Sequence, residues 1–147
     1  MSSKTQKKRG TMIITEKKQK INDASEMVNV LRSILNTEDE ISREREHFWV
    51  VGLNAKNVIQ YIELCSLGTL TSALIHPRET FRLAVFKGVA SIVALHSHPS
   101  NDVTPSREDI VITERLSEAG DVLGIKLLDH IIIGDGYCSM LEKGYIK

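Results

Sequence analysis

Apolar residues recur along the chain at two spacings, which predict an alternation of helices and strands. Over residues 23–35 the spacing is helical, and an acidic pair three residues apart resembles a capping box at the helix start. The continuous apolar run 48–53 predicts a buried strand. The turn residues 54–57 join it to an antiparallel partner, 58–65, where polar residues such as Glu63 indicate partial contact with solvent.

The same alternation continues to the end of the chain. Pro77 is expected to begin a helix that runs to about Lys87, and a second continuous apolar strand follows. The inner face of that helix is predicted to consist of Phe81, Ala84, Val85 and Gly88. Three further elements are expected: a helix from about Pro105 to Gly120–Gly124, a strand at 126–133, and a short strand from Tyr137. The order α-β-β-α-β-α-β-β predicts an α/β fold, a layered α-β-α sandwich with a mixed sheet.

Length and charge change this picture mainly at the amino terminus. A chain of 147 residues suits one domain, expected at 23–147, after a basic tail at 1–22 that we expect to be flexible. Lysine plus arginine equals aspartate plus glutamate, 19 each, so no overall field attracts nucleic acid or membranes. The tail leaves two interpretations open: an arm that associates with DNA or RNA through phosphates, or a solubilising end.

Cysteine usage and hydropathy bear on the compartment. Cys65 and Cys138 are isolated, and neither a secretory signal nor an apolar run long enough to span a bilayer is present. We therefore expect a reduced, cytoplasmic setting without a membrane partner.

The candidate chemistry begins where the apolar run 91–95 ends. Side chains alternate along a strand, so His96 and His98 project to the same side, with imidazoles close enough to share one ion. Pro99 ends the strand at this point. The two histidines predict a metal chelate at the mouth of a strand.

Asp109 is the expected third ligand. Thr104 and Pro105 predict a helix start, with Thr104 as N-cap, which places Ser106 and Asp109 three residues apart on one face. The apolar stripe that follows Asp109 indicates that its carboxylate points toward the protein body. Two imidazoles and one carboxylate leave a fourth tetrahedral position for water, as in a catalytic zinc site.

These residues carry a resemblance to a known family. The segment HSHPSNDVTPSRED, His96–Asp109, resembles the signature of JAMM (MPN+) metalloproteases. PRE at 77–79 and LLDHIIIGDGY at 127–137 resemble the RadC family more narrowly. The sequence departs from that family at Asn101 and Val103, where RadC proteins usually carry glycine and proline, a difference expected to affect loop rigidity more than chemistry.

The resemblance implies the JAMM, cytidine-deaminase-like arrangement and a zinc-dependent hydrolase that cleaves an amide or isopeptide bond. His96, His98 and Asp109 would hold Zn²⁺. Glu46, a glutamate that leads into an apolar strand, would be the general base, and the Ser106 hydroxyl would donate to a developing oxyanion. The substrate would be a peptide or protein that the sequence does not identify.

Other interpretations stay open beside this one. The chain could be a RadC-type DNA-repair or recombination accessory with a structural or vestigial zinc site. A deaminase is excluded because H-x-E with P-C-x-x-C is absent. His130 is either a hydrogen-bonded structural histidine or a partner of the ligands, and Arg78 and Glu79 match the family motif or form a helix-start ion pair. His47 and His76 have no predicted role.

Overall fold

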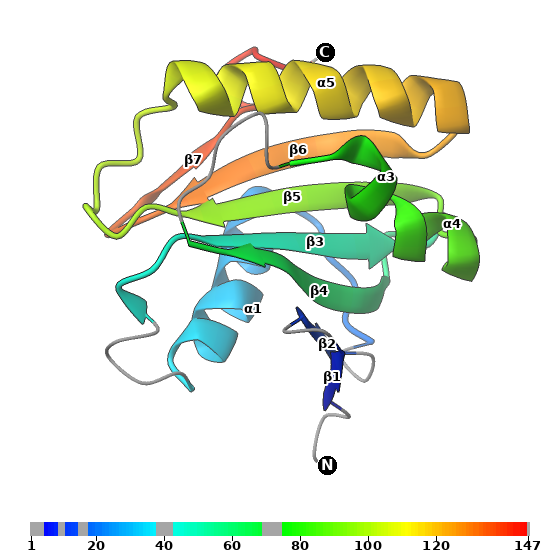
Figure 1. Cartoon of the computed structure of the whole chain (residues 1–147), viewed down its shortest axis with the longest axis horizontal. Helices are drawn as coiled ribbons and strands as arrows, with labels where there is room; N and C mark the ends of the chain where they lie inside the picture. The colour runs from blue at the N-terminus through cyan, green and yellow to red at the C-terminus, as the bar shows by residue number, and fades with distance from the viewer. Residues whose placement is uncertain (1–4, 9–10, 15–17, 38–42, 69–74, 147) are drawn as a thin grey trace.

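The computed structural model describes residues 5–8, 11–14, 18–37, 43–68 and 75–146. The described strands form one mixed sheet of seven strands in the order β1-β2-β4-β3-β5-β6-β7, with helices on both faces (Figure 1). In chain order the elements are β1 (Thr5–Lys8), β2 (Thr11–Ile14), α1 (Ala24–Leu35), β3 (His47–Leu53), β4 (Ile59–Leu67), α3 (Pro77–Thr80), α4 (Arg82–Lys87), β5 (Ser91–Ser97), α5 (Arg107–Leu123), β6 (Lys126–Ile133) and β7 (Tyr137–Ser139).

The central strands β3 and β5 bring two distant segments of the chain together. Every residue of β3 is buried, because β3 lies between β4 and β5 in the sheet and is covered on both faces. β3 runs antiparallel to β5, with Phe48 opposite His96, whereas β5 and β6 are parallel. The start of β3 therefore lies beside the end of β5, although about fifty residues of chain separate them.

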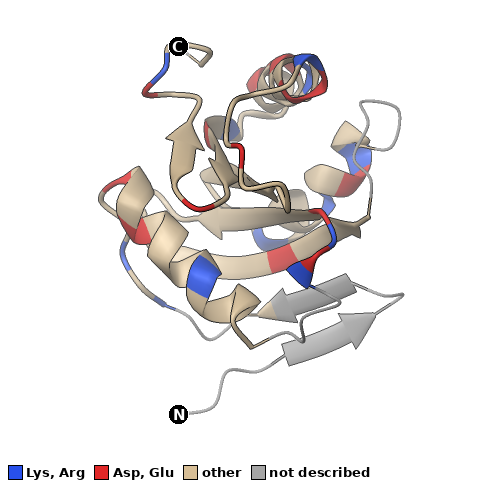
Figure 2. Ribbon diagram, turned by 90° about the vertical axis from the view of Figure 1, so that its left-hand side faces the viewer, with Lys and Arg blue, Asp and Glu red and all other residues tan. Residues whose placement is uncertain are grey.

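Each face of the sheet has its own apolar core. On one face α1 packs through Met27, Leu31 and Ile34 against the odd-numbered side chains of β3, such as Trp49 and Val51. On the opposite face α3, α4 and α5 cover the even-numbered side chains. Viewed along the strands, α1 and α5 lie on opposite sides of the sheet, and most charged positions lie on helices and connecting segments (Figure 2). The predicted layered α/β architecture is confirmed.

Most of the predicted elements are present, and several details differ, two of them around α3 and α4. The predicted helix 77–87 is two short helices that meet at Phe81, and Val85, expected on the inner face, is exposed. Glu63, expected in a partly solvated strand, is buried. Both differences arise from packing of α3 and α4 on the sheet: Glu63 lies near Glu79 and Arg82, and only Phe81 and Ala84 of the predicted face reach the core.

The start of α5 also differs from the prediction. Ser106, not Thr104, is the N-cap: its hydroxyl accepts from the Asp109 main-chain N–H, and the Asp109 carboxylate accepts from the Ser106 N–H. Thr104 instead donates its N–H to Asp102. The reciprocal pair satisfies two donors at the helix start, which a threonine cap two residues earlier would leave unmet.

The amino-terminal segment, expected to be a basic, flexible tail, contributes two strands among its described residues. β1 and β2 pair as a hairpin, and Ile13 and Ile14 of β2 pair with β4. Association of this segment with nucleic acid stays a prediction. Within the described part of the chain, no helix combines the length and apolar character needed to cross a membrane.

Candidate metal centre

Two histidines stand at the end of β5. His96 is buried on the strand, and His98 follows directly after it, with its main-chain N–H donating to the carbonyl of Ile133 on β6. This bond extends the strand pairing by one step, so both imidazoles project to the same side. Their ring centroids lie 4.6 Å apart.

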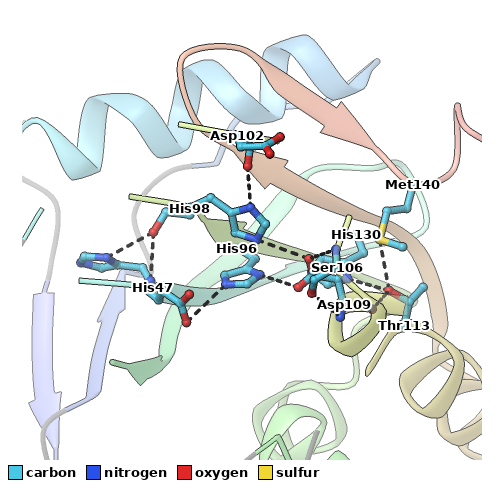
Figure 3. Close-up of polar contacts among 11 residues, drawn as sticks. His47, His96, His98, Asp102, Ser106, Asp109, Thr113, His130 and Met140 are labelled. Atoms are coloured by element: carbon cyan, nitrogen blue, oxygen red, sulfur yellow. Dashed lines mark hydrogen bonds and ion pairs between the residues drawn. The ribbon is translucent and has the colours of Figure 1, made fainter. Parts of the chain in front are cut away.

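Asp109, in the first turn of α5, faces both rings (Figure 3). Its Oδ1 lies 3.0 Å from His96 Nδ1, and its Oδ2 lies 3.3 Å from His98 Nε2. One potential ligand atom from each of the three residues lies within 4.8 Å of the others. The structure thus brings together His96, His98 and Asp109 as a group that could hold a metal ion.

The hydrogen bonds around the group fit a cation at its centre. His98 Nδ1 lies 2.7 Å from the carbonyl oxygen of Asp102, which only accepts, so Nδ1 carries a proton and the neutral ring has its lone pair on Nε2. That lone pair faces the Asp109 carboxylate. A lone pair on His98 Nε2 and the Asp109 carboxylate repel each other unless a positive charge, from a proton or a metal ion, lies between them.

The carboxylate of Asp109 is held in its ionised form. Burial by itself would raise the pKa of Asp109, but hydrogen bonds from His96 and from the Ser106 N–H outweigh burial and hold the pKa well below its usual range. A buried carboxylate that stays charged is suited to bind a cation.

The loop between the histidines and α5 has a backbone requirement that the sequence meets. Asn101 has φ 66°, a left-handed conformation that glycine adopts most readily and that asparagine tolerates better than most residues. Its N–H donates to the carbonyl of His98. Asparagine can therefore take the place of the glycine usual in RadC proteins while keeping this turn.

Glu46 lies beside the metal-binding group, at the entrance to β3. Its Oε2 lies 4.0 Å from His96 Nε2, and its side chain is partly exposed, at 33%. Both residues line a cavity of about 620 Å³, together with His98, Ser106 and Asp109. The Glu46 carboxylate thus faces solvent in the cavity and the buried imidazole at the same time.

Ser106 lines the same cavity. As N-cap its oxygen accepts a hydrogen bond from the Asp109 N–H, 3.1 Å away, and this bond does not use the hydroxyl proton. The cap and a donor role in the cavity are therefore compatible. The roles of Glu46 and Ser106 stay predictions.

A second layer of polar residues supports the ligands from within the core. Thr113 donates its hydroxyl to the Asp109 carbonyl, 2.7 Å away, and its oxygen lies 2.7 Å from His130 Nδ1. Burial lowers the pKa of His130 to about 3, so this ring is neutral, and it stacks at 6.3 Å on His96. His130 is thus a hydrogen-bonded core residue that also contacts the metal-binding group. Thr113 was missed, although its position four residues after Asp109 on one helix face was a readable signal.

The remaining candidates lie outside the centre. His47 is buried, with Nδ1 2.8 Å from the Arg45 carbonyl, and His76 precedes α3 without a side-chain cap bond. Glu79 forms its exposed ion pair with Arg82, at 3.5 Å, rather than with Arg78.

Fold and site together define the class of protein: a three-layered α/β domain with a histidine–histidine–aspartate group at a strand end. Residues 21–145 match the family described as RadC-like JAB domain, and the chain belongs to that family. It is 56% identical to a UPF0758 protein of Caldanaerobacter subterraneus subsp. tengcongensis over 102 residues, 69% of this chain and 44% of that protein.

Two further relatives are similar over a comparable share of their own length. A UPF0758 protein of Desulforamulus reducens is 52% identical over 74% of this chain and 48% of its own length. Another, of Staphylococcus haemolyticus, is 47% identical over 86% of this chain and 54% of its own length. The chain thus spans about half the length of the curated relatives it matches.

Proposed function

We propose that this domain is a zinc-dependent hydrolase that cleaves an amide or isopeptide bond. The observation that carries the proposal is the convergence of His96, His98 and Asp109 in one cavity with Glu46, a carboxylate 4.0 Å from His96 Nε2. Membership of the RadC-like JAB family supports the same chemistry.

The donor set favours zinc among the common ions. Two imidazoles and one carboxylate are borderline ligands that suit Zn²⁺, whereas Ca²⁺ and Mg²⁺ prefer oxygen ligands in larger number. Three protein ligands also leave one position of a tetrahedral site open, as catalytic zinc sites do. Bound zinc would polarise the scissile carbonyl and lower the pKa of a water molecule.

The residues of the chain would then divide the remaining work. Glu46, partly exposed in the cavity, would accept a proton from the attacking water and pass it to the leaving amine. Ser106 would donate its hydroxyl proton to the oxygen on which negative charge develops. Thr113 and His130 would hold the Asp109 main chain and the His96 ring in place from behind.

The test combines zinc content with turnover in matched variants. Wild-type protein supplied with zinc should hold about one ion per chain, and His98→Ala should lose most of it because one of three protein ligands is removed. Glu46→Gln should keep zinc while turnover of a peptide or isopeptide substrate falls by about a hundredfold or more, since the amide cannot accept a proton.

Two controls separate the roles. His76→Ala removes a histidine outside the centre and should leave zinc content unchanged, and Glu44→Gln removes an exposed carboxylate that lines the same cavity and should leave turnover unchanged. Wild-type protein that stays metal-free with zinc supplied would refute the metal site. Undiminished turnover in Glu46→Gln would refute its role as the base.

A further inference from the structure

A second cavity adjoins the metal centre on the far side of the His98–Pro99 segment. Its volume is about 420 Å³, and its wall includes Arg32 from α1 and Arg43 from the segment before β3. His98 and Pro99 line both this cavity and the one that holds the metal-binding group. The two cavities are therefore neighbours that share one wall.

Arg32 is fixed in place by the main chain. Its Nη2 donates to the carbonyl oxygens of Gly134, Asp135 and Gly136, at 3.2, 3.0 and 2.9 Å. These neutral acceptors orient the guanidinium without cancelling its charge. Among the described residues, no carboxylate lies at ion-pair distance from Arg32, so the cavity wall carries an oriented positive charge.

Arg43 adds a second positive charge from the segment that also carries Glu46. Residues 44–46 line the metal cavity, whereas Arg43, immediately before them, lines the second cavity. Arg43 is exposed, and within the described ranges it has no ion-pair partner. A single short segment thus places a carboxylate beside His96 and a guanidinium in the adjoining cavity.

The two cavities differ in charge. Four carboxylates, those of Glu44, Glu46, Glu108 and Asp109, line the metal cavity with one arginine, Arg45. The second cavity has two arginines and one carboxylate, that of Asp135. Even with one Zn²⁺ ion counted, the formal charge lining the first cavity is −1, whereas that of the second is +1, so an anionic group on a bound molecule would favour the second cavity.

We propose that the second cavity is a substrate subsite in which Arg32 and Arg43 bind a carboxylate of a peptide close to the amide bond that is cleaved. This proposal rests on the proposed hydrolase, because it assigns the neighbouring cavity to the same substrate. The shared wall of His98 and Pro99 limits the separation to a few residues, since an extended peptide advances about 3.3 Å per residue. The carboxylate is a side chain or a free carboxyl terminus, two sources of one chemistry.

The test uses short alanine peptides as probes, with binding measured by fluorescence anisotropy at low salt. One probe has a central glutamate, the second has glutamine there, and both are blocked at each end; a third has the glutamine and a free carboxyl terminus. The protein is the zinc-supplied Glu46→Gln chain, in which hydrolysis of the probes should be slower by about a hundredfold or more than in the wild type. The glutamate probe should bind about tenfold more tightly than the glutamine probe, as expected for hydrogen bonds between charged groups.

Arg43→Gln is the decisive variant, because Arg43 makes no ion pair among the described residues and its loss should not disturb the fold. The preference for glutamate should fall to less than about threefold. Lys56→Gln is the matched control: it removes an exposed positive charge in the turn between β3 and β4, at the opposite end of β3 from Phe48 and His96, and should keep the full preference. If the third probe binds more tightly than the blocked glutamine probe, the cavity also accepts the carboxylate of a free carboxyl terminus.

Equal binding of the glutamate and glutamine probes, or equal effects of Arg43→Gln and Lys56→Gln, overturns the subsite. So does Arg43-dependent binding of a short oligonucleotide without any preference among the peptides, since the ligand would then be a phosphate. Zinc content, measured on the same samples, reports separately on the proposed hydrolase. A chain that lacks zinc but keeps an Arg43-dependent preference refutes the hydrolase and leaves the carboxylate-binding cavity standing.

Discussion

Glu63 is a buried carboxyl in the middle of β4, on the same face as Tyr61 and Cys65. Glu63 is 3% exposed, and the thiol of Cys65 donates to its Oε1 at 3.3 Å. Burial raises the pKa of Glu63 above its ordinary value of 4.5. The folded protein therefore favours the protonated, neutral form more than the unfolded chain does.

Because of this shift, ionisation of Glu63 makes the fold less stable as the pH rises. The contribution of Glu63 is fully present below pH 4.5 and is lost as the pH rises through the raised value, because ionisation is easier in the unfolded chain. Glu63→Gln keeps the acceptor for Cys65 and cannot ionise. The variant should gain melting temperature relative to wild type at pH 7 to 8 and gain less, or none, near pH 4 to 5.

Thermal unfolding followed by circular dichroism across this pH range measures the effect. Glu118→Gln, an exposed position on α5, is the control and should show no such dependence on pH. A Glu63→Gln difference that stays constant with pH would contradict the assignment of Glu63 as the titrating group.

At the scale of the element, the amino terminus of α5 combines a helix cap with the metal centre. Ser106 and Asp109 bond reciprocally, and the same Asp109 carboxylate reaches His96. Loss of the cap would therefore act on helix stability and on the position of a ligand together.

Ser106→Ala should lower the free energy of unfolding by about 1 kcal/mol, because the Asp109 N–H loses its acceptor. Ser106→Thr retains a hydroxyl and should stay within about 0.5 kcal/mol of wild type. Urea denaturation measures both values, and turnover on the proposed substrate class should follow the same order. Wild-type stability in Ser106→Ala would contradict the capping role.

The turn from α5 into β6 requires the main chain of Gly120 to lie close to that of Ile125. A Cβ at Gly120 in α5 would lie 2.4 Å from the carbonyl oxygen of Ile125, so only glycine allows α5 to turn directly into β6. This turn positions the strand that carries His130 against the helix that carries Asp109.

At the scale of the whole molecule, the metal-binding group joins the sheet to the layer above it. His96 lies at the end of β5 and His98 directly after it, whereas Asp109 comes from the first turn of α5. An ion held by all three would link these elements in the folded state only. Binding should therefore be coupled to stability.

Zinc at about a hundred times its dissociation constant should raise the melting temperature of the wild type by roughly 5–10 °C, from the free energy of binding and the size of the domain. A chelator should reverse the increase. His98→Ala should show little change with zinc or chelator, since the three-residue group is broken. A comparable increase in His98→Ala would mean that zinc acts elsewhere on the chain.

Local patterns in the sequence determined most of the secondary structure. The strands near 48–53 and 126–133, the turn between β3 and β4, and a helix ending near Gly124 were predicted, because apolar spacing and turn residues act within a few positions. The proximity of His96 and His98 was equally local, since alternation along one strand places them together. Asp109 required only one loop and one helical turn more.

Tertiary structure alone decided the features that depend on distant segments. The pairing of Phe48 with His96 brings Glu46 to the metal-binding group, and the packing of α1 beside the His98 loop brings Arg32 to the second cavity. The burial of Glu63 likewise follows from tertiary packing, since its carboxyl lies near Glu79 of α3 and Arg82 of α4, segments distant from β4 in the layer above the sheet. The sequence by itself specified which residues could serve as ligands, because that depends on neighbouring positions. Which other charges stand beside them was decided by the fold, since sheet order and layer packing are set by contacts across the whole chain.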